Sequence, residues 1–188
     1  MQIRRSASGS GGYDAVTIFL HWLITILVLL MFVLAIWPGV LKGATVLHKW
    51  VGMLLPVLVV LRIIWRLTFG RGSDATADEP WFIRIGAKAA HIALYALLLI
   101  TPMLGWLYVD SRADTLNTWG LDMPMLVYYN RPLQYQLYFW KQVAAYSLLA
   151  LIVLHVIAAV GYHYVIRQDG VLNSMLPRRL RRPMMARG

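Results

Sequence analysis

Residues 16–37 read VTIFLHWLITILVLLMFVLAIW, an apolar stretch that contains no aspartate, glutamate, lysine or arginine. An α-helix rises about 1.5 Å per residue, so roughly 20 apolar residues are needed to cross the hydrocarbon layer of a bilayer. This stretch therefore predicts a transmembrane helix. The whole chain is similarly apolar, since 60% of its 188 residues are hydrophobic and only 14% are charged. Such a composition excludes an ordinary soluble domain of this size.

Three further apolar stretches predict membrane-spanning helices, at about residues 45–67, 85–109 and 142–166. The second of them carries charges only towards its ends, where Lys49 and Arg62 can reach the interface or meet a buried anion. The connection over residues 110–139 is rich in tryptophan, tyrosine and proline and predicts an ordered cap. Residues 1–188 are thus predicted to form one domain, an all-α transmembrane four-helix bundle with a basic tail over residues 167–188.

Lysine and arginine are concentrated on one side of the predicted bundle. That side has Arg4, Arg5, Arg66, Arg71, Arg84, Lys88, Arg167, Arg178, Arg179, Arg181, Arg182 and Arg187, and the other has Lys42, Lys49, Arg112, Arg131 and Lys141. Because the positively charged side of a membrane protein stays in the cytoplasm, both termini are predicted to be cytoplasmic. The tail arginines are expected to contact anionic lipid. The formal charge of +10 is thereby explained without a nucleic-acid partner.

Histidines are the ionisable groups that single out a site in this chain. His21, His48, His91 and His155 fall one apiece into the four apolar stretches, and His163 follows near the end of the last one. An imidazole inside the hydrocarbon layer is costly unless it binds something. The chain has no cysteine, so iron–sulfur and thiolate centres are excluded and any metal centre must be held by imidazole.

Two of these histidines are predicted to lie at similar depth. His21 comes about 8 Å after the start of the first helix, and His155 precedes the predicted end of the fourth, which runs the opposite way. Both then lie in the cytoplasmic half of the bilayer. A haem could bridge them.

His48 lies near the outer surface instead, at the start of the second helix. The matching position on the fourth helix is fourteen residues before His155, since that spacing returns to nearly the same helix face about 21 Å away. Lys141 occupies it. His91 and His163 are not on the same stripe as these residues, and we interpret them as candidates for quinone hydrogen bonding, proton transfer or propionate contact.

The chain resembles the prokaryotic cytochrome b-561 family, small four-helix proteins of the bacterial inner membrane that carry two b haems and exchange electrons with quinone. The matching pieces follow one another along nearly the whole chain. They are His21-Trp22-Leu23, His48 with Gly52, the segment from Leu61-Arg62 to Arg66-Leu67, His91 with Tyr95, Leu154-His155, His163-Tyr164, and Asp169 with Leu176-Pro177-Arg178-Arg179.

The resemblance implies that His21 and His155 ligate an inner haem b and that His48 ligates an outer one. Arg62 can either reach the inner surface with Arg66 or pair with a haem propionate, and we favour the propionate because a guanidinium partway into the span needs an anionic partner. The chain departs from the family at the second outer ligand, because Trp140-Lys141-Gln142 stands where the family has tryptophan, histidine and an acid. Three outcomes follow: Lys141 ligates iron as a neutral amine, the outer haem is five-coordinate, or only one haem is bound.

The expected function is that of an inner-membrane cytochrome that carries electrons between a donor on the periplasmic side and the quinone pool. The donor could be superoxide, which would make the protein an oxidoreductase of the superoxide:quinone type, or a periplasmic redox protein. One alternative is a cytochrome b anchor subunit that accepts electrons from a dehydrogenase or hydrogenase. Another is a haem-free proton channel or transporter, in which the same histidines relay protons.

Overall fold

The structure, a computed structural model, describes residues 13–69 and 80–160. These residues form α1 (Ala15–Ile36), α2 (Ala44–Thr68), α3 (Trp81–Asp110) and α4 (Arg131–Val156), with a small hairpin of β1 (Asn117–Thr118) and β2 (Leu121–Asp122) between α3 and α4. Each of the four helices is long and apolar enough to cross a membrane, and the fourth apolar span continues to Val160. The predicted all-α transmembrane four-helix bundle is confirmed.

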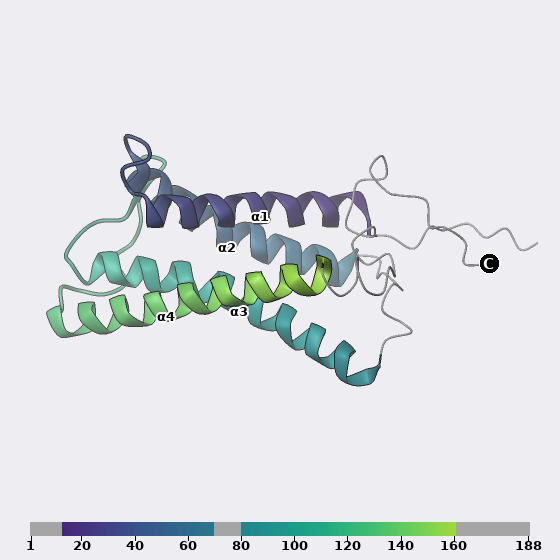
Figure 1. Cartoon of the computed structure of the whole chain (residues 1–188). Coiled ribbons are helices and arrows are strands. Elements are labelled where there is room, and N and C mark those ends of the chain that lie inside the picture. Colours follow the sequence, from purple (N-terminus) through teal and green to yellow (C-terminus); the bar gives the residue numbers. More distant parts are fainter. Residues whose placement is uncertain (1–12, 70–79, 161–188) are drawn as a thin grey trace, which may run out of the picture.

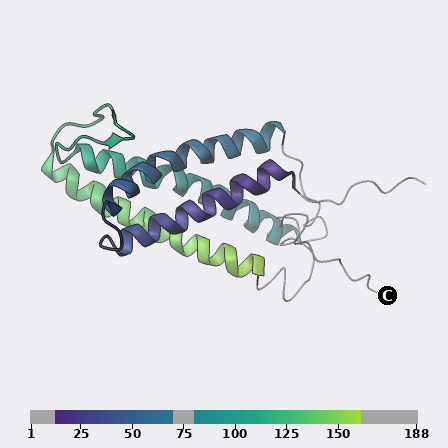
Figure 2. The same cartoon turned by 90° about the horizontal axis from the view of Figure 1, so that it is seen from above.

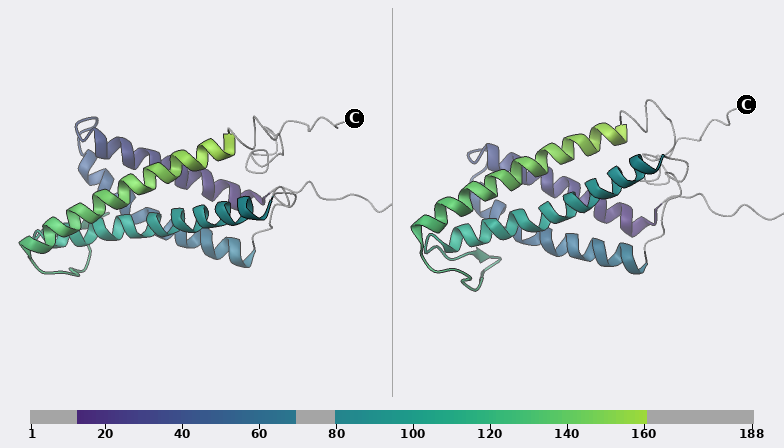
Figure 3. Two further views of the ribbon diagram at one scale, coloured as in Figure 1. Left: turned by 60° about the horizontal axis from the view of Figure 1, so that its bottom comes forward. Right: turned by 90° about the horizontal axis from the view of Figure 1, so that it is seen from below.

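The helices run alternately up and down, so both loops described between helices lie at one end of the bundle (Figure 1). We call this the loop end; it carries residues 37–43 and residues 111–130. The opposite end, where α1 begins, is called the α1-start end. α1 packs against α2, α2 against α3, and α3 against α4, an order that can be followed in Figures 2 and 3. Within the described residues, the backbones of α1 and α4 make few close approaches to each other.

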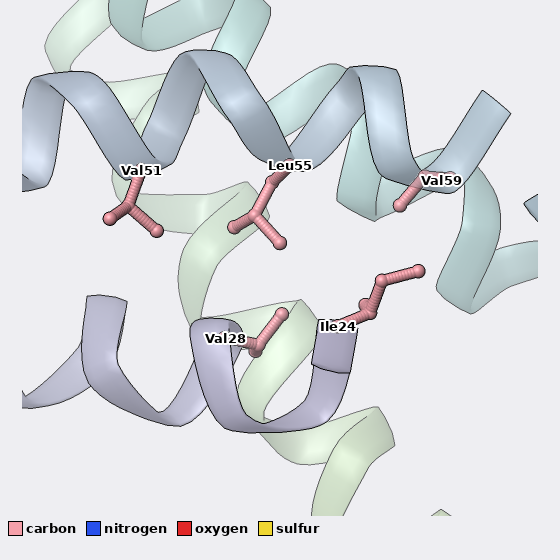
Figure 4. Packing of buried hydrophobic residues seen from close by; sticks show 5 residues of the cluster. All are labelled: Ile24, Val28, Val51, Leu55 and Val59. Carbon is pink, nitrogen blue, oxygen red and sulfur yellow. The ribbon is translucent and has the colours of Figure 1, made fainter. Parts of the chain in front are cut away.

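A cluster of buried apolar side chains lies between α1 and α2. Ile24 and Val28 of α1 face Val51, Leu55 and Val59 of α2 (Figure 4), and Val59 has no exposed surface. Leu98 and Leu99 of α3 and Ile152 of α4 pack against the edge of this cluster. The cluster fixes the relative position of α1 and α2, and therefore of the histidines that these two helices carry.

The fourth helix begins earlier than the apolar stretch indicated. We expected it to start near residue 142, whereas α4 starts at Arg131. Asn130 caps the helix because its side chain accepts a hydrogen bond from the Leu133 amide, and Pro132 occupies the first turn, where a proline costs no hydrogen bond. These polar first turns extend the helix beyond the apolar region. As a result, Lys141 lies about 15 Å inside the helix and not at its tip.

The loop over residues 111–130 is folded back on the bundle. The carboxylate of Asp110, which is almost fully buried, accepts a 2.7 Å hydrogen bond from the Leu126 amide. Trp119 and Gly120 have positive φ angles of 53° and 78°, and they form the tight turn between β1 and β2. β1 packs against α2. The ordered cap predicted for this connection is therefore present over the loop end.

The first turn of α1 is tied to the last turns of α2. Asp14 caps α1 by accepting hydrogen bonds from the Thr17 amide at 3.0 Å and the Thr17 hydroxyl at 2.7 Å, and it also accepts one from Trp65 Nε1 at 3.0 Å. Burial raises the pKa of the Asp14 carboxyl, but these hydrogen bonds outweigh it and hold that pKa below the ordinary value of 3.8.

Replacing Asp14 with alanine is expected to lower the free energy of unfolding by about 1 kcal/mol at pH 7, the usual cost of losing a helix cap. Because the folded protein has the lower pKa, the carboxylate stabilises the protein at pH values above 3.8, and this contribution is lost as the pH falls through the folded value. Thermal unfolding at pH 7 and pH 3 measures both effects. Asp14→Asn is the matched control, which keeps the cap but should lose the acid dependence; equal stability of all three proteins at pH 7 would contradict the assignment.

Candidate functional site

Three of the histidines meet at the α1-start half of the bundle. The ring centroids of His21 on α1 and His155 on α4 are 6.4 Å apart, and those of His91 on α3 and His155 are 5.3 Å apart. Each ring is partly buried. The predicted pairing of His21 with His155 in depth is thus realised, and His91 joins them.

The spacing of His21 and His155 suits one metal atom held between the two rings. Histidine nitrogens bind metals at about 2.0 Å, so two imidazoles on opposite sides of one metal have ring centroids roughly 6 Å apart. His21 and His155 match this spacing, whereas His91 is closer to His155 than the spacing requires. The described residues contain no group of three or more histidine, aspartate or glutamate side chains that could hold a bare metal ion. Two imidazoles suffice for haem, because the porphyrin supplies the other four nitrogen ligands.

The packing of the helices agrees with a flat group at this place. α1 and α4 make few close backbone approaches, so the pair is formed by side chains that reach across the space between two separated helices. In contrast, α1 is packed tightly against α2 by the cluster around Val59. The residues present therefore fit a haem between α1 and α4.

His91 is fixed by its own helix. Its Nδ1 donates a 2.7 Å hydrogen bond to the Ala87 carbonyl one turn earlier, which leaves Nε2 as the free nitrogen of the ring. The ring contacts His155 at its side. This position beside the inner pair allows His91 to donate or accept a proton next to a bound group.

Arg62 is buried near the three histidines, with 6% of its surface exposed. Its Nη1 donates a 2.8 Å hydrogen bond to the Thr17 carbonyl, and its Nε donates a 3.1 Å hydrogen bond to the Tyr95 hydroxyl. Arg62 thereby joins α2 to α1 and α3. Both partners are neutral, and among the described residues the one ion pair is that of Lys49 with Asp114. The guanidinium is therefore a buried charge with remaining N–H groups, which suits an anionic partner such as a propionate.

The second candidate site lies near the loop end, around His48 on α2. The His48 ring interacts with the backbone of Met31 on α1, and its Nδ1 is buried with no hydrogen-bond partner. The indole nitrogens of Trp50 and Trp106 near the same end, on α2 and α3, are also buried without a partner. Buried polar atoms in native proteins nearly always have partners. Three unmatched nitrogens at one end of the bundle thus favour a bound group there.

Lys141 lies against aromatic rings. Its Nζ is 5.0 Å from the ring centroid of Tyr108 on α3 and 5.4 Å from that of Tyr138 on α4, and an electrostatic interaction links it to His48. The structure therefore brings Lys141 into the neighbourhood of His48, as the helix spacing predicted. His163 lies outside the described residues.

No role was predicted from the sequence for the tyrosines of these two sites, although Tyr95 is one of the residues that carry the family resemblance. Tyr95 holds Arg62, and Tyr108 and Tyr138 hold Lys141. The spacing of Tyr95, one helical turn after His91, carried a signal, since residues four apart share a helix face. Nothing comparable marks Tyr108, because the chain has ten tyrosines and several of them lie at the membrane ends.

Comparison with known proteins agrees with this geometry. The family model described as prokaryotic cytochrome b561 matches residues 12–178. The protein called cytochrome b561 homolog 2 of Escherichia coli (strain K12) is 29% identical over 175 residues, which cover 87% of this chain and 90% of that protein. The probable superoxide oxidase CybB of Yersinia pestis is 25% identical over 177 residues, which cover 89% and 97%.

The family match spans all four helices and both candidate sites. Proteins of this family bind b-type haem, so the alternative of a haem-free channel or transporter is set aside. The chain belongs to the prokaryotic cytochrome b561 family and is a bacterial multi-pass membrane cytochrome that binds b-type haem and transfers electrons.

Proposed function

We propose that this cytochrome oxidises superoxide at the loop end and passes the electrons to quinone, using two b haems in the bacterial inner membrane. The observation that carries the proposal is the pairing of His21 and His155 across the bundle at 6.4 Å. The proposal places the loop end at the periplasmic face of the membrane and both termini in the cytoplasm.

The proposed haem ligands come from opposite halves of the bundle. His21 and His155 hold the inner haem, and His48 holds the outer one, with Lys141 as a candidate for its second ligand. Arg62 pairs with a propionate of the inner haem. When bound, the haems supply the one-electron chemistry, whereas the protein sets their potentials through ligands, burial and nearby charge.

Superoxide is proposed as the donor because the loop end is cationic. The lysines and arginines of this end are Lys42, Lys49, Arg112, Arg131 and Lys141. Three acids lie nearby: Asp110 is buried and accepts a hydrogen bond from a backbone amide, Asp114 pairs with Lys49 at 3.7 Å, and Asp122 accepts a hydrogen bond from the Asn117 side chain. The five cations outnumber these three acids. A positive surface raises the local concentration of an anionic substrate. The relative from Yersinia pestis, described as a probable superoxide oxidase, adds support.

Quinone is proposed to bind at the inner half, where His91 offers a free Nε2 beside His155. A hydrogen bond from His91 to a quinone oxygen would both orient the ring and deliver a proton during its reduction. His163 is a second candidate for this role.

A second candidate function is that of an anchor subunit that accepts electrons from a periplasmic redox protein. It is favoured by the exposed aromatic side chains of the cap, where Tyr128 is 85% exposed and Tyr129 63%. Tyrosine is enriched at protein interfaces. In this function the cap binds the redox partner, and the electrons pass through the haems to quinone as before.

The test uses the purified protein in detergent or vesicles. Two haems per chain are expected in a pyridine haemochrome assay, and superoxide generated in the presence of a short-chain quinone should produce quinol in proportion to the superoxide consumed. Superoxide dismutase should abolish quinol formation. Two haems without any superoxide-dependent quinol would favour the anchor subunit, and a colourless protein would contradict both functions.

A further inference from the structure

Lys141 and the two tyrosines beside it form a small cluster at the loop end, which we call the Lys141 cage. The ammonium lies over the rings of Tyr108 and Tyr138, whose centroids are 5.7 Å apart. A cation is attracted to the negative face of each ring. The Arg112 guanidinium approaches the ring of Tyr108 as well, at 5.7 Å from its centroid. Two cations therefore gather around one tyrosine.

In this arrangement the Lys141 nitrogen lies over aromatic faces, as an ammonium does, and this favours the five-coordinate outcome over ligation by lysine. A lysine that ligates iron must offer the lone pair of a neutral amine, whereas an ammonium has three N–H donors and no lone pair. In the structure the Lys141 nitrogen is held by aromatic faces on α3 and α4. His48, on α2, lies in its electrostatic neighbourhood and has a buried nitrogen without a partner. The His48 imidazole and the Lys141 nitrogen therefore lie near each other at the loop end.

A surface groove adjoins the cage. A groove of about 230 Å³ is lined by Tyr108, Gln134, Tyr135 and Tyr138, so it shares two of its walls with the cage. Tyr135 and Tyr138 are exposed, at 62% and 48%. The groove is large enough for a molecule of a few atoms and too small for a quinone with its tail.

We propose that the outer haem is ligated by His48 alone, and that its other side accepts a small ligand of two or three atoms which enters through this groove and receives a hydrogen bond from Lys141. The inference rests on the proposed function in one respect, the presence of an outer haem. Of the three outcomes that follow from lysine in place of histidine at position 141, this proposal corresponds to a five-coordinate outer haem. Diatomic molecules are expected because the groove is small, and small anions are expected because the donors around it, Arg112 and Lys141, are cationic.

Carbon monoxide and azide are suitable probes of the purified protein with both haems bound. The reduced protein is expected to bind one carbon monoxide for every two haems, and the oxidised protein to bind azide with a change in its high-spin absorption. In Lys141→His a second imidazole is supplied, so carbon monoxide binding should fall at least tenfold and the outer haem should become low-spin. In Lys141→Gln, carbon monoxide binding should persist while azide affinity falls about tenfold, because a charge-assisted hydrogen bond is lost.

Lys88→Gln is the matched control, since it removes an exposed lysine of α3 at the opposite end of the bundle, away from the cage and the cationic loop end. It should leave both probes unaffected. Two low-spin haems that ignore carbon monoxide and azide would overturn the inference and leave the proposed function standing. A single haem that survives in His48→Ala would also overturn it, since no outer haem would exist. A protein without haem would instead contradict the proposed function itself.

Discussion

Replacing His155 with alanine is expected to remove the inner haem, and with it one of the two haems per chain and all electron transfer to quinone. His155 faces His21 at the spacing of two ligands of one metal, and without it His21 would be the single protein ligand between two helices that make few close backbone approaches. His21→Ala should have the same effect. Pyridine haemochrome counting and the reduced-minus-oxidised spectrum of the purified variants measure the loss.

His91→Ala is the matched control, because His91 is also a partly buried histidine in contact with His155. Its Nδ1 is already bound to the Ala87 carbonyl and its distance from His155 is too short for two ligands facing each other across one metal. The inner haem should therefore remain in His91→Ala, although quinone reduction slows. If His91→Ala lost the haem and His21→Ala kept it, the inner pair would have to be His91 with His155.

Arg62→Leu should destabilise the bundle and lower the potential of the inner haem. The substitution leaves the Thr17 carbonyl and the Tyr95 hydroxyl without their donor, and each unmatched buried group costs about 1–3 kcal/mol. Arg62 also acts electrostatically on His21, His91 and His155. Loss of one positive charge that acts over a separation of roughly 10 Å corresponds to roughly 2 kcal/mol at an effective dielectric constant near 20. The expected shift is therefore on the order of 50–100 mV to lower potential.

Redox titration and thermal unfolding separate the two effects. Arg62→Lys keeps the charge but not both hydrogen bonds, so it should lose stability while the potential stays near that of the parent protein. Arg84→Leu removes an exposed arginine near the same end and should change neither quantity appreciably. An unchanged potential in Arg62→Leu would show that the guanidinium does not act on the inner haem.

The fold of this chain was largely predictable because the lipid imposes one solution. Every backbone polar group in the hydrocarbon layer must be satisfied within its own helix, so an apolar stretch of sufficient length can hardly be anything else. The meeting of His21 and His155 was predictable for a related reason, since helix rise converts sequence position directly into depth. The start of α4 was not, because the cap at Asn130 and the polar turns after it stand outside the apolar pattern.

The contacts that orient the site residues were less accessible to sequence reasoning. The depth of Lys141 relative to His48 follows from helix spacing, but the direction of its side chain depends on Tyr108, which belongs to another helix. The same is true of Arg62, whose partners lie on α1 and α3. Pairings between helices depend on rotation about each helix axis, and a hydrophobic pattern that is apolar all round does not fix that rotation.

The sparse backbone contact between α1 and α4 bears on how the protein is made. α1 with α2 and α3 with α4 are hairpins that can enter the membrane one after the other during synthesis, each held by its own packing. α2 packs against α3 and so joins the two hairpins on one side, and a haem held by His21 and His155, as we propose, would join them on the other side, between α1 and α4. Chains made during iron starvation would consequently stay open along that seam, where membrane proteases can recognise and remove them before a defective redox protein accumulates.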